Sequence, residues 1–205
     1  MHTIGIDEAG RGSLIGPLVV AGVYAGANEL RIFRKLGVRD SKALTPGKRE
    51  ILFSALEEHN TLFHVVEISP SEIDGCSLNE LELCAAAEIA RTIDRPEARI
   101  VLDVPAFGKG IERYCKKLQE KLFRKETVII GGNRMESKNL AVAAASIIAK
   151  VVRDRKIEQL KNRYGDFGSG YPNERTVAYV RANYQTIEPI VRKKWKTLKT
   201  MKHET

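Results

Sequence analysis

Two adjacent carboxylates at the end of an apolar run are the residues of this chain best placed to do chemistry. The run 3–6 leads directly into Asp7 and Glu8, and the residues that follow include Gly10, Arg11 and Gly12. Carboxylate oxygens on a rigid strand suit a divalent cation such as Mg²⁺. Glycine backbone can approach a ligand closely, and an arginine beside it can bind a phosphate. The segment therefore indicates metal-assisted chemistry on a nucleic acid, although acidic residues followed by glycine are also typical of a solvated turn.

Two further carboxylates occupy comparable places in the sequence. Asp103 ends the apolar run 99–103, and Glu136 lies between the apolar run 127–130 and a long apolar stretch that begins at Ala141. Phosphoryl transfer by two metal ions needs three or four carboxylates converging on ions about 3.5–4 Å apart. Taken alone, Asp103 is equally consistent with a capping or turn aspartate, and Glu136 with a solvated loop residue.

The composition favours a cytoplasmic, single-domain protein with a polyanionic partner. The chain has 205 residues, 43% of them hydrophobic, and a net charge of +8. Basic residues are concentrated at 192–202, where Trp195 lies among them. Three isolated cysteines and four scattered histidines argue against a disulfide framework, a zinc site and a histidine-based site. No apolar run approaches the roughly 18 residues of a membrane span, and no signal peptide is evident, so we expect no membrane partner.

The order of elements predicts an α/β fold with a mixed sheet. Apolar, β-rich runs predict strands at 3–8, 17–25, 62–68, 99–103 and 127–130. Helices are expected at 28–37, from Thr45-Pro46 onward with Ile51 on the buried face, and at 77–93, 110–123, 141–164 and 176–184, with a glycine-rich loop at 165–173. The first two strands can pair as a hairpin. Because sites in open α/β sheets form at strand ends, the carboxylates are expected to meet there.

Several motifs, in order along almost the whole chain, resemble those of ribonuclease HII, the type 2 ribonuclease H, in its archaeal form. The opening Gly-Ile-Asp-Glu-Ala-Gly-Arg-Gly at 5–12 and the run Ala-Ala-Ser-Ile-Ile-Ala-Lys-Val at 144–151 are the most specific. Asp-Ser-Lys at 40–42, Leu-Asn-Glu at 78–80, Gly-Ser-Gly-Tyr-Pro at 168–172 and Pro-Ile-Val-Arg-Lys at 189–193 also match.

The resemblance implies a ribonuclease H-like fold: a five-stranded mixed sheet flanked by helices, in a single catalytic domain (1–205) with a helical C-terminal extension at about 165–205. It implies endonucleolytic cleavage of RNA in RNA–DNA hybrids and at single ribonucleotides embedded in duplex DNA, with 3′-hydroxyl and 5′-phosphate ends. It also implies a Mg²⁺ or Mn²⁺ cofactor and a monomer. A sliding clamp is a conceivable partner, but 199–205 lacks the glutamine and paired aromatics of a clamp-binding peptide.

The resemblance also implies roles for individual residues. Asp7, Glu8 and Asp103 match three catalytic, metal-binding carboxylates, and Glu136 stands where the family usually has an aspartate as the fourth. Asp154 is a rival for that fourth place, but its position between two arginines favours a structural ion pair. The substrate-binding matches are Gly10, Arg11, Gly12, Lys42 and Tyr171, the last packing on the deoxyribose at an RNA–DNA junction, and Arg192 is a candidate phosphate contact.

Two other functions remain as alternatives. One is a different nuclease of the same fold, such as a junction resolvase or a ribonuclease that cleaves continuous hybrids only. The Gly-Arg-Gly loop and Tyr171 disfavour it. The other is a hybrid-binding protein without activity, which the intact set of carboxylates disfavours.

Overall fold

A five-stranded mixed sheet forms the centre of the molecule. The computed structural model describes residues 2–38, 44–122, 126–195 and 198. Neighbouring strands follow the order β3-β2-β1-β4-β5. The antiparallel pairs are β1 with β2 and β2 with β3, whereas β4 is parallel to both β1 and β5. The strands are β1 (Thr3–Ala9), β2 (Leu18–Ala25), β3 (Phe63–Ile68), β4 (Arg99–Asp103) and β5 (Ile129–Gly132).

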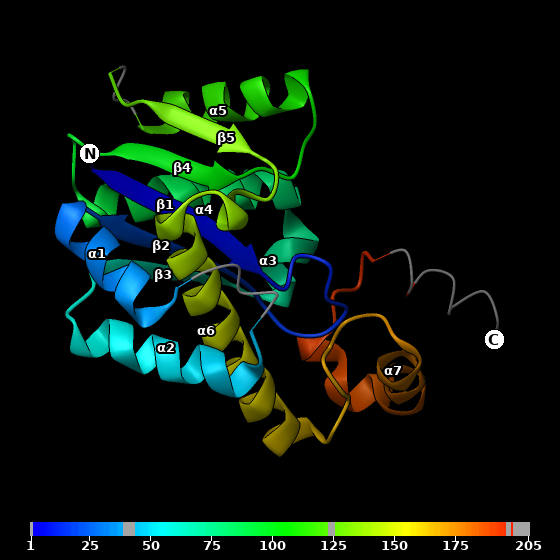
Figure 1. The fold of residues 1–205 in the computed structure, drawn as a ribbon. Coiled ribbons are helices and arrows are strands. Elements are labelled where there is room, and N and C mark those ends of the chain that lie inside the picture. Colours follow the sequence, from blue (N-terminus) through cyan, green and yellow to red (C-terminus); the bar gives the residue numbers. More distant parts are fainter. Residues whose placement is uncertain (1, 39–43, 123–125, 196–197, 199–205) are drawn as a thin grey trace.

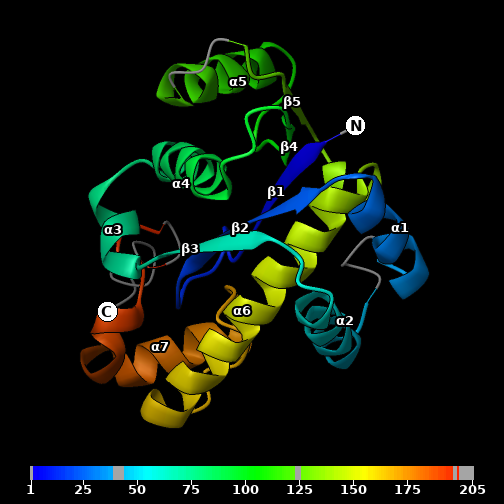
Figure 2. The same cartoon turned by 90° about the vertical axis from the view of Figure 1, so that its left-hand side faces the viewer.

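Helices cover both faces of this sheet (Figure 1). One face carries α1 (Ala27–Leu36), α2 (Pro46–Glu58) and α6 (Leu140–Tyr164), and the other carries α4 (Leu78–Ile93) and α5 (Lys109–Leu122), as the rotated view in Figure 2 shows. The remaining helices are α3 (Pro70–Gly75), α7 (Glu174–Ile187) and the short 3₁₀ turns η2 (Met135–Ser137) and η3 (Glu188–Ile190). The predicted α/β fold with a hairpin at its start is confirmed.

The long helix α6 lies unusually close to the central strand. The side chain of Asn139 caps its N-terminus by accepting bonds from two backbone N–H groups, and the half that follows is small, apolar and fully buried. Gly5 faces it from β1, where a β-carbon would lie only 2.2 Å from the backbone carbon of Ala141. Glycine therefore sets the distance between strand and helix, and with it the position of the strand end that carries Asp7.

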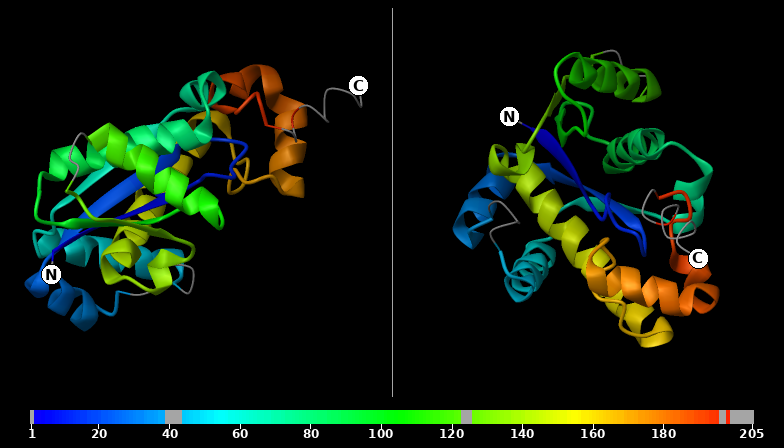
Figure 3. Two further views of the ribbon diagram at one scale, coloured as in Figure 1. Left: turned by 90° about the horizontal axis from the view of Figure 1, so that it is seen from above. Right: turned by 90° about the vertical axis from the view of Figure 1, so that its right-hand side faces the viewer.

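The C-terminal part of the chain packs against the loop that follows β1. Leu14 and Ile15 share a buried cluster with residues of α7 and its flanking segments, including Phe167 and Ile187. Ile15 also forms an isolated antiparallel bridge with Val191. Figure 3 shows α7 beyond the end of the sheet at which the loop after β1 emerges. No helix in the described part of the chain is both long and apolar enough to span a membrane.

The structure differs from the sequence-based predictions in three places. The strand expected at 127–130 runs from Ile129 to Gly132. Its last two residues are glycines that make room for neighbouring side chains, Gly131 for Cys115 and Val104 and Gly132 for Met135. The short helix α3, capped by Ser69 and Glu72, was not anticipated. Ile51 was expected on the buried face of α2, but it is 71% exposed.

Candidate active site

The sequence-predicted carboxylates meet at one end of the sheet, at the C-terminal ends of the parallel strands β1 and β4. The pairing of Ile6 with Leu102 brings Asp7 beside Asp103, one residue further along each strand. Because side chains alternate along a strand, Asp7 and Asp103 lie on the face covered by α6, whereas Glu8 lies on the face covered by α4. Glu136, in the 3₁₀ turn after β5, is buried beside the first pair.

Asp7 is held in a buried and electronegative environment. Burial raises its pKa to about 6, a hydrogen bond with the Ser146 side chain acts in the opposite direction, and the charges of Asp103 and Glu136 raise it further. Ser146 is the only hydroxyl in the buried apolar half of α6. The sequence analysis did not single it out, although a serine inside an alanine-rich run was a usable signal.

Asp103 and Glu136 form a coupled pair. Burial raises the pKa of Asp103, and the charge of Glu136 and a hydrogen bond between the two carboxyl groups raise it further. Backbone N–H groups of Met135 and Arg134 oppose this by donating to Asp103. Arg134 adopts a left-handed conformation, with φ of 55°, at the start of the turn that carries Glu136. That turn explains how a residue outside the strands reaches the site.

Glu8 faces a second, buried layer of polar groups that the sequence analysis missed. Burial raises its pKa well above the usual value, and the charges of Asp7 and Glu82 add to this. Glu82 is buried on α4 and forms an ion pair with Arg11, which also donates to Asn79 Oδ1 at 2.6 Å. The Arg11 side chain is therefore held by protein groups while remaining 30% exposed. The signal for Glu82 was a carboxylate on the apolar face of a helix.

The glycine loop and Tyr171 lie next to each other. A β-carbon on Gly12 would be 4.0 Å from Cε1 of Tyr171, and Gly10 has a φ of +89° that favours glycine. The backbone N–H groups of Leu14 and Ile15 both donate to the carbonyl of Gly170. Tyr171 itself is 40% exposed. The structure thus brings together two motifs that are about 160 residues apart in sequence. Gly12 in the first and Tyr171 in the second are both exposed.

Two buried arginines stabilise this arrangement. Arg153 stacks over the Tyr171 ring at 4.6 Å from its centroid and donates to Ser13 Oγ at 2.7 Å and to the Ser169 carbonyl at 2.9 Å. Arg192 donates from Nε to the Gly16 carbonyl at 3.0 Å and from Nη1 to the Arg11 carbonyl at 2.9 Å.

Arg192 is fully buried, so the expectation that it contacts a phosphate was wrong. Its guanidinium holds the backbone of the glycine loop instead. Asp154 accepts from Arg49 Nη2 at 3.0 Å and lies 3.7 Å from Arg153 Nη1, which confirms the predicted ion pair. Lys42 lies outside the described residues.

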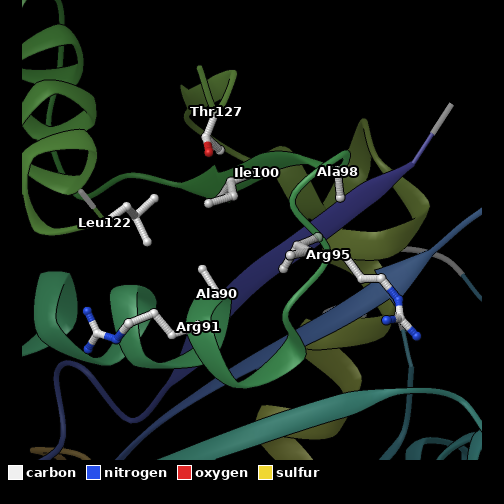
Figure 4. Close-up of a pocket in the computed structure, with 8 residues that line it drawn as sticks. Ala90, Arg91, Arg95, Ala98, Ile100, Leu122 and Thr127 are labelled. Carbon is white, nitrogen blue, oxygen red and sulfur yellow. The ribbon is translucent and has the colours of Figure 1, made fainter. Parts of the chain in front are cut away.

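A pocket of about 10 Å³ is lined by all three strand-end carboxylates together with Glu82 and Tyr114. Figure 4 shows another pocket of about 10 Å³ between α4 and β4, near Ala90 and Ile100. It lies toward the start of β4, whereas Asp103 ends that strand.

Comparison with known proteins identifies the family. The family model for ribonuclease HII matches residues 4–198. The chain belongs to the ribonuclease HII family. The ribonuclease HII of Sulfurisphaera tokodaii is 42% identical over 203 residues, which cover 97% of this chain and 94% of that protein.

Two solved structures extend the likeness to the whole ribonuclease HII fold. The ribonuclease H2 of Pyrococcus horikoshii superposes with a TM-score of 0.87 at 37% identity, covering 100% of this chain and 98% of that one. The ribonuclease HII of Archaeoglobus fulgidus, solved in complex with PCNA, gives a TM-score of 0.84 at 38% identity and covers 96% of both chains. As a member of this family, the chain is an endonuclease of the ribonuclease H class, and the predicted ribonuclease H-like fold is confirmed.

The carboxylates should make this ribonuclease HII more stable in mild acid when divalent ions are removed. The pKa of Asp7 is 3.8 in an unfolded chain and about 6 in the folded protein, so between these values the folded state binds more protons and stability falls as the pH rises. Asp7→Asn removes this effect. In the presence of a chelator at pH 7.5, the free energy of unfolding of the variant should exceed that of the wild type by an amount on the order of 1–3 kcal/mol, measured as a higher melting temperature. At pH 4.5 the difference should be much smaller. A difference independent of pH would contradict the assignment.

Proposed function

We propose that this protein uses divalent cations to cleave the RNA strand of RNA–DNA hybrids and to cut at single ribonucleotides embedded in duplex DNA. The products are a 3′-hydroxyl and a 5′-phosphate. The observation that carries the proposal is the convergence of Asp7, Glu8, Asp103 and Glu136 at one sheet edge, next to a glycine loop and an exposed tyrosine. Membership of the ribonuclease HII family supports the action on hybrids.

The donor chemistry of the site fits Mg²⁺ or Mn²⁺. All four candidate ligands are carboxylates, and burial and mutual repulsion raise the pKa values of the three strand-end groups. A bound cation would relieve this repulsion. In the described part of the chain no group of three or more His, Cys, Asp or Glu residues is arranged to hold a metal ion. Mg²⁺ usually keeps several waters and binds through one or two carboxylates together with substrate phosphates, so in this proposal the substrate completes its coordination. When bound, two such ions would lower the pKa of the attacking water and neutralise the charge on the scissile phosphate.

The residues of the chain supply rigidity and charge. Ser146 orients Asp7 from α6, and the backbone N–H groups of Arg134 and Met135 orient Asp103. Glu8 and Glu136 complete the set from the opposite face of the strand and from the turn after β5. Because three of these four residues lie on regular strands and the fourth on a 3₁₀ turn, little reorganisation is needed when the phosphate arrives.

Recognition of the ribonucleotide is assigned to the glycine loop and Tyr171. The 2′-hydroxyl distinguishes RNA from DNA and can both donate and accept a hydrogen bond. Backbone groups of Gly10, Arg11 and Gly12 can reach it without obstruction by a side chain at either glycine. Tyr171 presents a flat face to the adjoining deoxyribose, where an added hydroxyl would be crowded. Arg153, stacked on the other side of the ring, keeps this face in place.

Tyr171→Ala should impair cleavage at a lone ribonucleotide more than cleavage within continuous RNA. Only the first substrate presents an RNA-to-DNA junction at every productive encounter. Loss of a stacking contact is worth about 1–3 kcal/mol, so kcat/KM on the junction substrate should fall by one to two orders of magnitude. Tyr171→Phe should retain most of the activity. Equal losses on both substrates would show that Tyr171 only orders its loop.

The function is tested with a duplex that carries one ribonucleotide. Cleavage in Mg²⁺, on the 5′ side of that ribonucleotide and absent from the matched all-DNA duplex, supports the proposal. Cleavage of a continuous hybrid only would support the hybrid-restricted alternative, and binding without cleavage in either Mg²⁺ or Mn²⁺ would support the inactive binding protein.

The remaining assignments are also parts of the proposal. We infer a monomer that acts in the cytoplasm as a single catalytic domain, in which α7 and the segment after it form the C-terminal extension. The Archaeoglobus relative was solved with PCNA. Residues 199–205 of this chain contain no glutamine or aromatic residue and lie outside the described residues, so we assign no clamp contact to them.

A further inference from the structure

Phe107 is the most exposed large hydrophobic side chain in the described part of the chain. It is 83% exposed and belongs to the loop between β4 and α5, which directly follows Asp103. Single exposed hydrophobic residues are common on protein surfaces and need no explanation by themselves. The surroundings of Phe107 distinguish it from the others.

The loop that carries Phe107 is fixed by hydrogen bonds. Asn133, which follows β5, donates from Nδ2 to the carbonyls of Val104 at 2.8 Å and Ala106 at 3.0 Å. The N–H of Val104 donates to Gly132, and the carbonyl of Phe107 accepts from Gly110. The backbone on both sides of Phe107 is therefore tied down, so the ring is presented to solvent by an ordered loop.

The ring lies close to the scissile position and among positive charges. Phe107 is the fourth residue after Asp103, so their Cα atoms are at most about 14 Å apart. Lys109, Arg134 and Lys138 are exposed around the same loop and turn, and Lys138 donates to the carbonyl of Asn133 at 3.0 Å. An exposed apolar ring near the carboxylates and near several cations suits a nucleotide, because a nucleotide combines a negatively charged phosphate with the apolar face of a sugar.

We propose that Phe107 packs against a sugar of the bound duplex beside the cleavage site. The sugar is the accessible surface, because the base faces of a duplex are stacked on one another. This inference rests on the proposed function and adds a contact on the β4 side of the carboxylates, across from the glycine loop and Tyr171. The substrate would then be held from both sides of the scissile phosphate, by Tyr171 on one and Phe107 on the other.

The test measures the affinity of a continuous RNA–DNA hybrid by fluorescence anisotropy with Mg²⁺, in the full chain carrying Asp7→Asn to prevent cleavage. Phe107→Ala should weaken binding about tenfold, Phe107→Tyr should restore it, and Phe107→Leu should restore only part, because a branched side chain lacks the flat face. The melting temperature should be unchanged, since the ring is exposed. Val128→Ala is the matched control: this residue is 59% exposed but precedes β5 beside the start of β4, at the end of the sheet away from Asp103, so affinity should not change.

The salt dependence separates this contact from an electrostatic one. Phe107→Ala should lower affinity equally at all salt concentrations, whereas Lys109→Ala should reduce the slope of log K against log salt by about 0.7–0.9 if that lysine meets a phosphate. Wild-type affinity in Phe107→Ala, or an equal loss in Val128→Ala, would overturn the inference while leaving the proposed function intact. A parent chain that binds no hybrid at all would overturn both.

Discussion

Asp7→Asn should reduce cleavage by at least about a thousandfold while leaving hybrid binding nearly unchanged. Asparagine keeps the shape of the side chain and can still bond to Ser146, but it removes one of the charges that would hold two dications. Catalysis that depends on positioned charge is more sensitive to such a change than binding, which depends mainly on contacts with the phosphate backbone. The measurement is single-turnover cleavage of a hybrid in Mg²⁺, with affinity determined in parallel.

Asp154→Asn is the matched control for this experiment. Asp154 is likewise an aspartate, but it is paired with Arg49 on the outer side of α6. The Asp154→Asn variant should therefore cleave within about threefold of the wild type. Glu136→Gln should behave like Asp7→Asn if Glu136 is the fourth ligand. Normal cleavage by Glu136→Gln together with a large loss in Asp154→Asn would show that Asp154, and not Glu136, is the fourth ligand.

Gly5→Ala should have the largest effect on stability. The added carbon would lie 2.2–2.6 Å from three backbone atoms of Ala141 and Val142, and backbone at the start of a buried helix cannot turn aside as a flexible side chain can. Overpacking of a core costs roughly 1–3 kcal/mol, and more where the neighbour is rigid. We expect at least about 3 kcal/mol, which for a chain of this size lowers the melting temperature by about 6–12 °C.

Gly47→Ala provides the comparison in the same chain. No atom lies within 4 Å of its added carbon, and the residue is in the first turn of α2, where alanine is the better helix former. This variant should melt at or slightly above the wild-type temperature. If the melting temperature of Gly5→Ala equalled that of Gly47→Ala, the close approach of β1 and α6 would not be required. The position of Asp7 would then have to be set by other contacts.

Much of the site was predictable because its carboxylates end apolar strands. Asp7, Glu8 and Asp103 follow runs whose β character is clear, and parallel strands bring their carboxyl ends to one edge. Glu136 was harder to place, because the turn that carries it begins with a non-glycine residue in a left-handed conformation. The strand before it lies two residues further along than predicted and includes Gly131, which makes room for Cys115 of α5.

The second layer of the site could not be predicted from periodicity. Glu82 is a charged residue, which pattern analysis assigns to solvent, yet it is buried and paired with Arg11 behind Glu8. Arg192 was expected to contact a phosphate, but it is buried and its donors satisfy two carbonyls of a distant loop. In each case the burial depends on a partner that is remote in sequence, and local pattern carries no information about it.

The bridge between Ile15 and Val191 joins two segments that leave the ribosome at very different times during synthesis. The sheet and all four carboxylates are complete once the chain has emerged as far as α6, because β1 to β5 and η2 all precede it. The loop after β1 stays without its support until the segment around Arg192 has left the ribosome, some 180 residues after the loop itself was made. If the glycine loop and Tyr171 recognise the ribonucleotide as proposed, that recognition is acquired last, after the four carboxylates are already in place.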